Sequence, residues 1–104
     1  MVDQGTLDEI IRRVVDVAEP ERVILFGSAA RGDAGPRSDV DLLVVAEGGD
    51  RWDLAAMVYE RLAGVGVPVD AILVTPADLE RYKDSLGLVY RPALAEGRIV
   101  YEAA

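Results

Sequence analysis

The chain has 104 residues, 51% of them apolar, which is enough for one hydrophobic core and predicts a single domain over residues 1–104. Cysteine and histidine are both absent, which excludes disulfides, thiol nucleophiles, histidine acid/base chemistry and the common zinc sites. With 19 acidic and 11 basic residues the net charge is -8, whereas nucleic-acid binding depends on a positive surface. We therefore expect no direct nucleic-acid binding, and any catalysis must use carboxylates, arginines, hydroxyls and a hard metal ion.

The hydropathy pattern bears on where the protein works. No apolar run approaches the roughly eighteen residues of a membrane span, and no basic segment followed by an apolar one resembles a signal peptide. We therefore expect no membrane span and a cytoplasmic location.

The first half of the chain predicts a helix followed by two buried strands. Thr6 and Glu9 match a capping box, and apolar residues then recur at helical spacing until Pro20 stops the pattern. After Arg22, residues 23–26 are apolar and β-branched or bulky, so the segment 22–26 indicates a buried strand. Residues 40–46 form a near-continuous apolar run, as expected of a strand that is covered on both faces.

The second half predicts a long helix, a third strand and a short helix. Asp50 can cap the long helix, and residues 67–74 read as a strand interrupted in polarity only by Asp70. Thr75 and Pro76 favour the start of a short helix. The apolar stripe expected along the long helix consists of Trp52, Ala55, Ala56, Tyr59, Leu62 and Ala63.

The end of the chain is less regular. The path of residues 85–97 stays open, because their apolar spacing suits a helix while Pro92 would kink one or begin another. Residues 98–101 resemble a last short strand at a sheet edge. Together the elements predict an α/β (α+β) fold with helices packed on a small mixed β-sheet.

Two aspartates at the start of the second strand indicate chemistry. Side chains two residues apart on a strand share a face, so Asp39 and Asp41 should project together while Val40 and Leu42 point to the other side. Neighbouring carboxylates repel each other, and no lysine or histidine lies nearby in sequence to compensate. Mg²⁺ compensates such a pair and completes its coordination with water and phosphate oxygens.

Asp70 is the candidate third carboxylate, because its strand could lie beside the one with Asp39 and Asp41. Three carboxylates can hold two metal ions, one activating an attacking hydroxyl and the other stabilising a leaving pyrophosphate. The alternative is that Asp70, which follows Pro68 at the start of its strand, simply faces solvent.

The turn after the first strand is the candidate phosphate wall. Gly27 lets the backbone approach a phosphate closely, and Ser28 with neighbouring backbone N–H groups can cradle a nucleotide's terminal phosphates. Arg31 and Arg37 could reach phosphate oxygens, or Arg31 could hold the loop while Arg37 is solvated.

The glycine spacing in this turn needs comparison with better-known phosphate loops. Gly27 and Gly32 have the spacing of a P-loop, but Asp33 stands where that motif requires lysine. A Walker A site is therefore excluded, and the Rossmann glycine pattern is absent as well.

The combination of Gly-Ser with Asp-x-Asp resembles a known superfamily over about residues 7 to 101. The chain is similar to the DNA polymerase β-like nucleotidyltransferases, and its small size resembles their minimal nucleotidyltransferase (MNT) branch. The matching segments are Gly27-Ser28, Arg31-Gly32 and Ser38-Asp39-Val40-Asp41-Leu42.

The resemblance implies a role for each matching residue. Gly27 and Ser28 would hold the nucleotide triphosphate, and Arg31 lies in the same nucleotide-binding loop. Asp39 and Asp41 would coordinate the metal ions, and Asp70 would complete the site and help deprotonate the acceptor hydroxyl. The implied reaction transfers AMP from ATP with two Mg²⁺ ions and releases pyrophosphate.

The resemblance also implies a partner. Several MNT proteins are antitoxins that silence HEPN-domain toxins by adenylylating a toxin tyrosine. Because a lone palm-like domain offers little surface for an acceptor, a hetero-oligomer with such a toxin or a homodimer is expected. The partner could dock on Leu86, Leu88, Val89, Tyr90 and Leu94, although ordinary helix core is the alternative for these residues.

Two other functions stay open at this point. The protein could neutralise a partner by contact alone, with no catalysis. It could also transfer a nucleotide to a small molecule, which would require an acceptor pocket built by a dimer.

Overall fold

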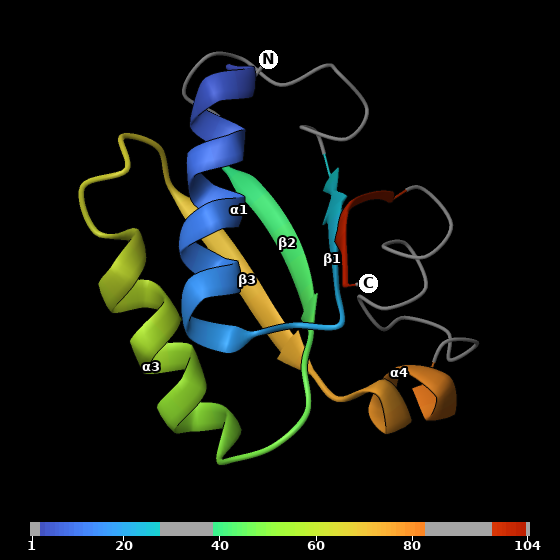
Figure 1. Cartoon of the computed structure of the whole chain (residues 1–104). Helices are drawn as coiled ribbons and strands as arrows, with labels where there is room; N and C mark the ends of the chain where they lie inside the picture. The colour runs from blue at the N-terminus through green and yellow to red at the C-terminus, as the bar shows by residue number, and fades with distance from the viewer. Residues whose placement is uncertain (1–2, 28–38, 83–96, 104) are drawn as a thin grey trace.

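The computed structural model describes residues 3–27, 39–82 and 97–103, and the expected α/β order of helices and strands is confirmed there (Figure 1). The open stretch at residues 83–96 and the candidate docking residues within it lie outside the described residues. The elements are α1 (Gln4–Ala18), β1 (Arg22–Phe26), β2 (Val40–Val45), α3 (Arg51–Leu62), β3 (Val69–Val74), α4 (Pro76–Tyr82) and β4 (Arg98–Glu102).

The four strands form one mixed sheet in the order β3-β2-β1-β4, with β4 at an edge as predicted. β1 runs antiparallel to both β2 and β4, and β2 runs parallel to β3. Phe26 pairs with Asp41, and Asp41 pairs with Asp70. The C-terminal end of β1 therefore meets the N-terminal ends of β2 and β3 at one end of the sheet (Figure 1).

One face of the sheet is covered by α1 and α3, which pack against it side by side (Figure 1). The interior here is apolar, because every second residue of β1 and β2 points toward the helices. Its members are Leu7, Ile10, Val14, Ala18, Val23, Leu25, Val40, Leu42, Val44, Val58, Leu62 and Ala71.

The first helix starts three residues earlier than its capping box predicted. Asp3 is the N-cap, and its carboxylate accepts a hydrogen bond from the Thr6 backbone N–H at 3.1 Å. The predicted cap at Thr6 is therefore wrong, because the carboxylate of Asp3 caps the first helical N–H groups one turn earlier. Thr6 consequently lies inside the helix.

The opposite face of the sheet carries a smaller apolar cluster against α4. Leu79 of α4 packs on it, and the Asp78 backbone N–H donates to the Thr75 hydroxyl at 3.0 Å, which confirms the predicted helix start. The other members of this cluster are Ile24, Phe26, Leu43, Val45 and Val74.

The stripe predicted along α3 is wrong in part. Asp50 caps the helix as expected, but Trp52 is 86% exposed and Tyr59 is 43% exposed. The buried residues are Val58 and Leu62, which lie four apart and define the side that faces α1 and the sheet. Periodicity allowed either stripe, and packing against the sheet selected the one that contains Val58.

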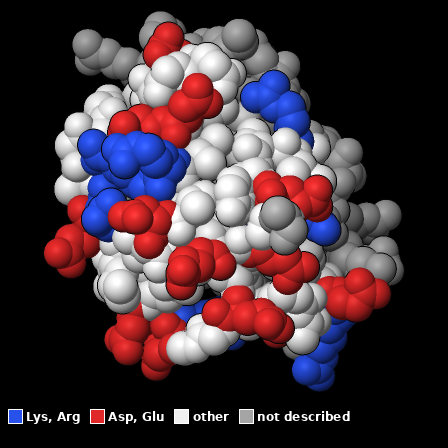
Figure 2. Space-filling model, in the orientation of Figure 1, with Lys and Arg blue, Asp and Glu red and all other residues white. Residues whose placement is uncertain are grey.

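Acidic side chains are spread over the face that carries α1 and α3, while basic ones gather in smaller groups (Figure 2). The two helices are joined by polar contacts: the Arg13 guanidinium donates to the carbonyls of Arg61 and Ala63 at 3.0 and 3.1 Å, and Arg61 pairs with Asp16. Within the described ranges, none of the helices has the length and apolar content to cross a bilayer.

Candidate functional site

Three aspartates share one end of one sheet face. Asp41 and Asp70 are register partners on the parallel strands β2 and β3, so their side chains project to the same side. Asp39 lies just before β2, two residues from Asp41, and its charge acts on the Asp41 carboxyl. This is the face that α4 covers at its other end, away from α1 and α3. Asp39 and Asp70 are exposed, and Asp41 is half-buried between them and β1.

The aspartates influence each other electrostatically. Burial raises the pKa of the Asp41 carboxyl, and the negative charges of Asp70 and Asp39 raise this pKa further. Like charges around a partly desolvated carboxylate destabilise its ionised form. The site thus holds excess negative charge that a bound cation would neutralise.

Gly27 closes the site from the β1 side. Its φ is 72°, in the left-handed region that suits glycine, and a Cβ at this position would overlap the Asp41 carboxylate. Only glycine lets the chain leave β1 this close to the acidic cluster. The other predicted residues of the phosphate wall, Ser28 and Arg31, lie outside the described residues, as does Arg37.

The acidic cluster offers the oxygen ligands that a divalent cation prefers, but its three carboxylates do not surround a common point. Among residues 3–27, 39–82 and 97–103, no three His, Cys, Asp or Glu side chains stand arranged as a finished metal site. Hard cations such as Mg²⁺ prefer carboxylate oxygens and complete their coordination with water and phosphate. Asp39, Asp41 and Asp70 supply oxygens of this type. Burial and the two neighbouring negative charges raise the pKa of Asp41, and a bound cation would offset both effects.

Tyr59 contacts the cluster from α3 and was missed as a site residue by sequence reasoning, which placed it in the buried stripe. Its hydroxyl accepts a hydrogen bond from the Ala71 N–H at 2.9 Å and lies 3.3 Å from Asp70 Oδ1. Burial raises the pKa of the Tyr59 hydroxyl, and the negative charge of Asp70 adds to this. No local pattern signals the contact, because it depends on how α3 packs beside β3.

The chain is similar to a known protein family and to individual proteins. Residues 7–100 match the family described as the nucleotidyltransferase domain. Two proteins of Methanocaldococcus jannaschii, each named "Putative protein adenylyltransferase", are similar in sequence. One is 46% identical over 63 residues, which cover 55% of this chain and 43% of the relative. The other is 36% identical over 81 residues, which cover 78% of both proteins. The chain therefore spans less than half the length of the first relative and most of the second.

A solved structure shares the fold. A chain in the crystal structure of a toxin–antitoxin with AMP-PNP superimposes with a TM-score of 0.64 at 22% identity, covering 92% of this chain and 73% of the other. At this identity the likeness concerns the fold. Because the family match spans nearly the whole chain, the protein belongs to the nucleotidyltransferase domain family.

Proposed function

We propose that this protein is a Mg²⁺-dependent nucleotidyltransferase that transfers AMP from ATP to a protein hydroxyl. The acceptor we propose is a tyrosine of a HEPN-type toxin, for which the protein serves as the cytoplasmic antitoxin. The observation that carries the proposal is the pairing of Asp70 with Asp41 across parallel strands, on the face that Asp39 shares and Gly27 closes. Asp41 lies close to Gly27, the residue at which we propose that phosphate approaches the backbone.

The relatives and the structural neighbour support the acceptor and the partner. Both sequence relatives are named as protein adenylyltransferases, and the neighbour is described as a toxin–antitoxin with AMP-PNP. These likenesses support ATP as the proposed substrate and a toxin as the proposed partner. A complex with the toxin would also supply the acceptor surface that a domain of this size lacks.

Each residue of the site has a proposed part in the reaction. Asp39, Asp41 and Asp70 would hold two Mg²⁺ ions, which when bound neutralise the phosphates and lower the pKa of the acceptor hydroxyl. Asp70 would accept the proton of that hydroxyl. The acceptor oxygen forms a bond to the α-phosphorus of ATP while the bond from this phosphorus to the bridging oxygen breaks, and pyrophosphate leaves with the electron pair.

The remaining residues bind the nucleotide. The absence of a side chain at Gly27 allows phosphate to approach the backbone between β1 and Asp41. Ser28 and Arg31 would add a hydroxyl and a guanidinium to this wall.

A double substitution, Asp39→Asn with Asp41→Asn, tests the proposal. The protein is incubated with α-labelled ATP, Mg²⁺ and the purified HEPN toxin, and label on each chain is located by mass spectrometry. We expect transfer to fall about 1,000-fold, because metal charge stabilisation is worth several kcal/mol and each 1.36 kcal/mol is tenfold in rate. The same variants are tested for toxin neutralisation in growing cells.

Asp50→Asn is the matched control, because asparagine also caps helices and Asp50 lies at the start of α3. It should keep full transfer and full neutralisation. Loss of transfer with retained neutralisation would assign the antitoxin effect to contact alone. Unchanged transfer in the double variant would refute the proposed site.

A further inference from the structure

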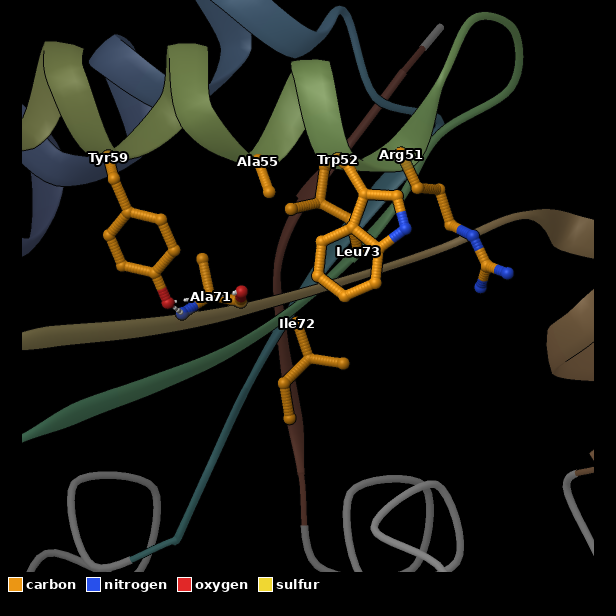
Figure 3. Close-up of a pocket in the computed structure, with 7 residues that line it drawn as sticks. All are labelled: Arg51, Trp52, Ala55, Tyr59, Ala71, Ile72 and Leu73. Carbon is orange, nitrogen blue, oxygen red and sulfur yellow. Dashed lines mark hydrogen bonds between the residues drawn. The ribbon is translucent and has the colours of Figure 1, made fainter.

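The outer edge of β3 is occupied at one position by a side chain instead of a strand. β3 ends the sheet, and the hydroxyl of Tyr59 reaches its edge from α3 (Figure 3). The Ala71 N–H donates to this hydroxyl at 2.9 Å, and the Ala71 carbonyl lies 3.3 Å from it. Tyr59 therefore accepts from the Ala71 N–H and lies within hydrogen-bond distance of the Ala71 carbonyl, the two groups that a further strand would have paired at this position.

The same hydroxyl also contacts the acidic cluster. Asp70 Oδ1 lies 3.3 Å from the Tyr59 oxygen, and Asp70 directly precedes Ala71 in β3. The other side of Asp70 is held by the ladder to β2, in register with Asp41. Asp70 is thus constrained from both sides of its strand, by β2 within the sheet and by Tyr59 beyond its edge.

Two hydrogen-bond acceptors lie at the same distance, 3.3 Å, from the Tyr59 hydroxyl. A phenol has one O–H donor, so Tyr59 donates either to the Ala71 carbonyl or to Asp70 Oδ1 while it accepts from the Ala71 N–H. Both acceptors lie near the start of β3, just after Pro68. Either donation therefore limits the movement of Asp70 relative to Asp41.

We propose that Tyr59 is a positioning residue, which holds the outer edge of β3 at Ala71 and so keeps the Asp70 carboxylate beside Asp41. The inference rests on the proposed function, in which Asp70 completes the metal site. Partners that orient metal ligands are worth roughly 10- to 100-fold in metal affinity or activity. The hydroxyl, and not the aromatic ring, carries this effect.

Tyr59→Phe removes the hydroxyl and keeps the ring, and the 43% exposure of the side chain favours a retained fold. Mn²⁺ binding is measured by electron paramagnetic resonance in the presence of α,β-methylene ATP. We expect Tyr59→Phe to bind Mn²⁺ roughly 10- to 100-fold more weakly. Hydrogen exchange followed by mass spectrometry should show faster exchange in the peptide that contains Ala71.

Tyr101→Phe is the matched control, because Tyr101 lies on β4 and packs on the face covered by α1. It should bind Mn²⁺ as the wild type does. Since Tyr59 acts through Asp70, adding Tyr59→Phe to Asp70→Asn should weaken Mn²⁺ binding no further than Asp70→Asn alone.

The outcomes separate this inference from the proposed function. Wild-type Mn²⁺ affinity in Tyr59→Phe, with weakened binding in Asp70→Asn, would overturn the positioning role and leave the metal site intact. A lower melting temperature of Tyr59→Phe with unchanged Mn²⁺ affinity would likewise overturn it, because the hydroxyl would then serve the fold alone. Wild-type affinity in Asp70→Asn would refute the proposed site itself.

Discussion

The two faces of the sheet are built from the same strands but differ in the size of the apolar cluster that each one carries among the described residues. The face under α1 and α3 is apolar along its length, and neighbouring residues of β2 such as Val40, Leu42 and Val44 are fully buried there. Among the described residues, the other face carries a smaller apolar cluster that includes Leu79 of α4, and Asp41 and Asp70 lie at one end of this face. The larger apolar core therefore lies on one face, while one end of the other face carries an acidic cluster whose carboxylates repel one another.

The strongest test of this contrast is a cavity on the helix-covered face. Leu42→Ala should lower the free energy of unfolding by about 2 to 5 kcal/mol, because Leu42 is fully buried and the surrounding helices relax only in part. Ile99→Ala on β4 is the matched control, since Ile99 is 52% exposed and its loss should change stability by about 0.5 kcal/mol or less. Urea denaturation measures both. Equal effects would contradict the expectation that the buried face under α1 and α3 stabilises the fold more than the exposed side chain on β4 does.

A smaller loss is expected where the acidic face meets the turn after β1. Gly27→Ala should cost about 1 to 2 kcal/mol for its left-handed φ of 72°, and more because the new Cβ overlaps the Asp41 carboxylate. Gly48→Ala is the control: its φ is 87°, and no heavy atom lies within 4 Å of the added Cβ. The difference between the two variants isolates the contact with Asp41.

Thermal and urea unfolding of both glycine variants give the comparison. Adding Asp41→Ala to Gly27→Ala should remove most of the excess loss, because the overlapping carboxylate is gone. If Gly27→Ala and Gly48→Ala lose the same stability, the close approach between Gly27 and Asp41 does not constrain the fold.

The smallest expected effect is a pH dependence of stability on the acidic face. Burial and the charges of Asp70 and Asp39 raise the pKa of Asp41 in the folded state, so the folded protein binds more protons than the unfolded chain between the unfolded and the folded pKa. Stability from this residue is therefore fully present below the unfolded pKa and is lost as the pH rises through the folded pKa. Asp41→Asn should lack this loss and be more stable than the wild type at neutral pH.

The pH series is measured by urea denaturation in EDTA, with Asp50→Asn as the control. The stability difference between Asp41→Asn and the wild type should grow as the pH rises through the window and then stay level. A difference that shrinks instead would mean that Asp41 is stabilised by its surroundings. Added Mg²⁺ with ATP should reduce the advantage of Asp41→Asn, since only the wild type would gain from the bound cation.

Local patterns predicted several parts of the molecule well, because short-range physics decides them. The two-residue period of a strand places Asp39 and Asp41 on one side, and Thr75 with Pro76 starts α4 as expected. The caps were predicted where one candidate stood alone, as at Asp50. The cap of α1 was predicted at Thr6 and lies at Asp3 instead. Roles for Ser28 and Arg31 stay predictions, since these residues lie outside the described part of the chain.

The amino-acid sequence by itself determined the elements, the acidic motif and the family. Tertiary structure decided what lies next to what: the parallel pairing that sets Asp70 opposite Asp41, the approach of Gly27 to that carboxylate, and the reach of Tyr59 across the edge of β3. Propensity and periodicity act within a few residues of chain. Register and edge contacts depend instead on the packing of segments far apart in sequence, which also exposed Trp52 and buried Val58.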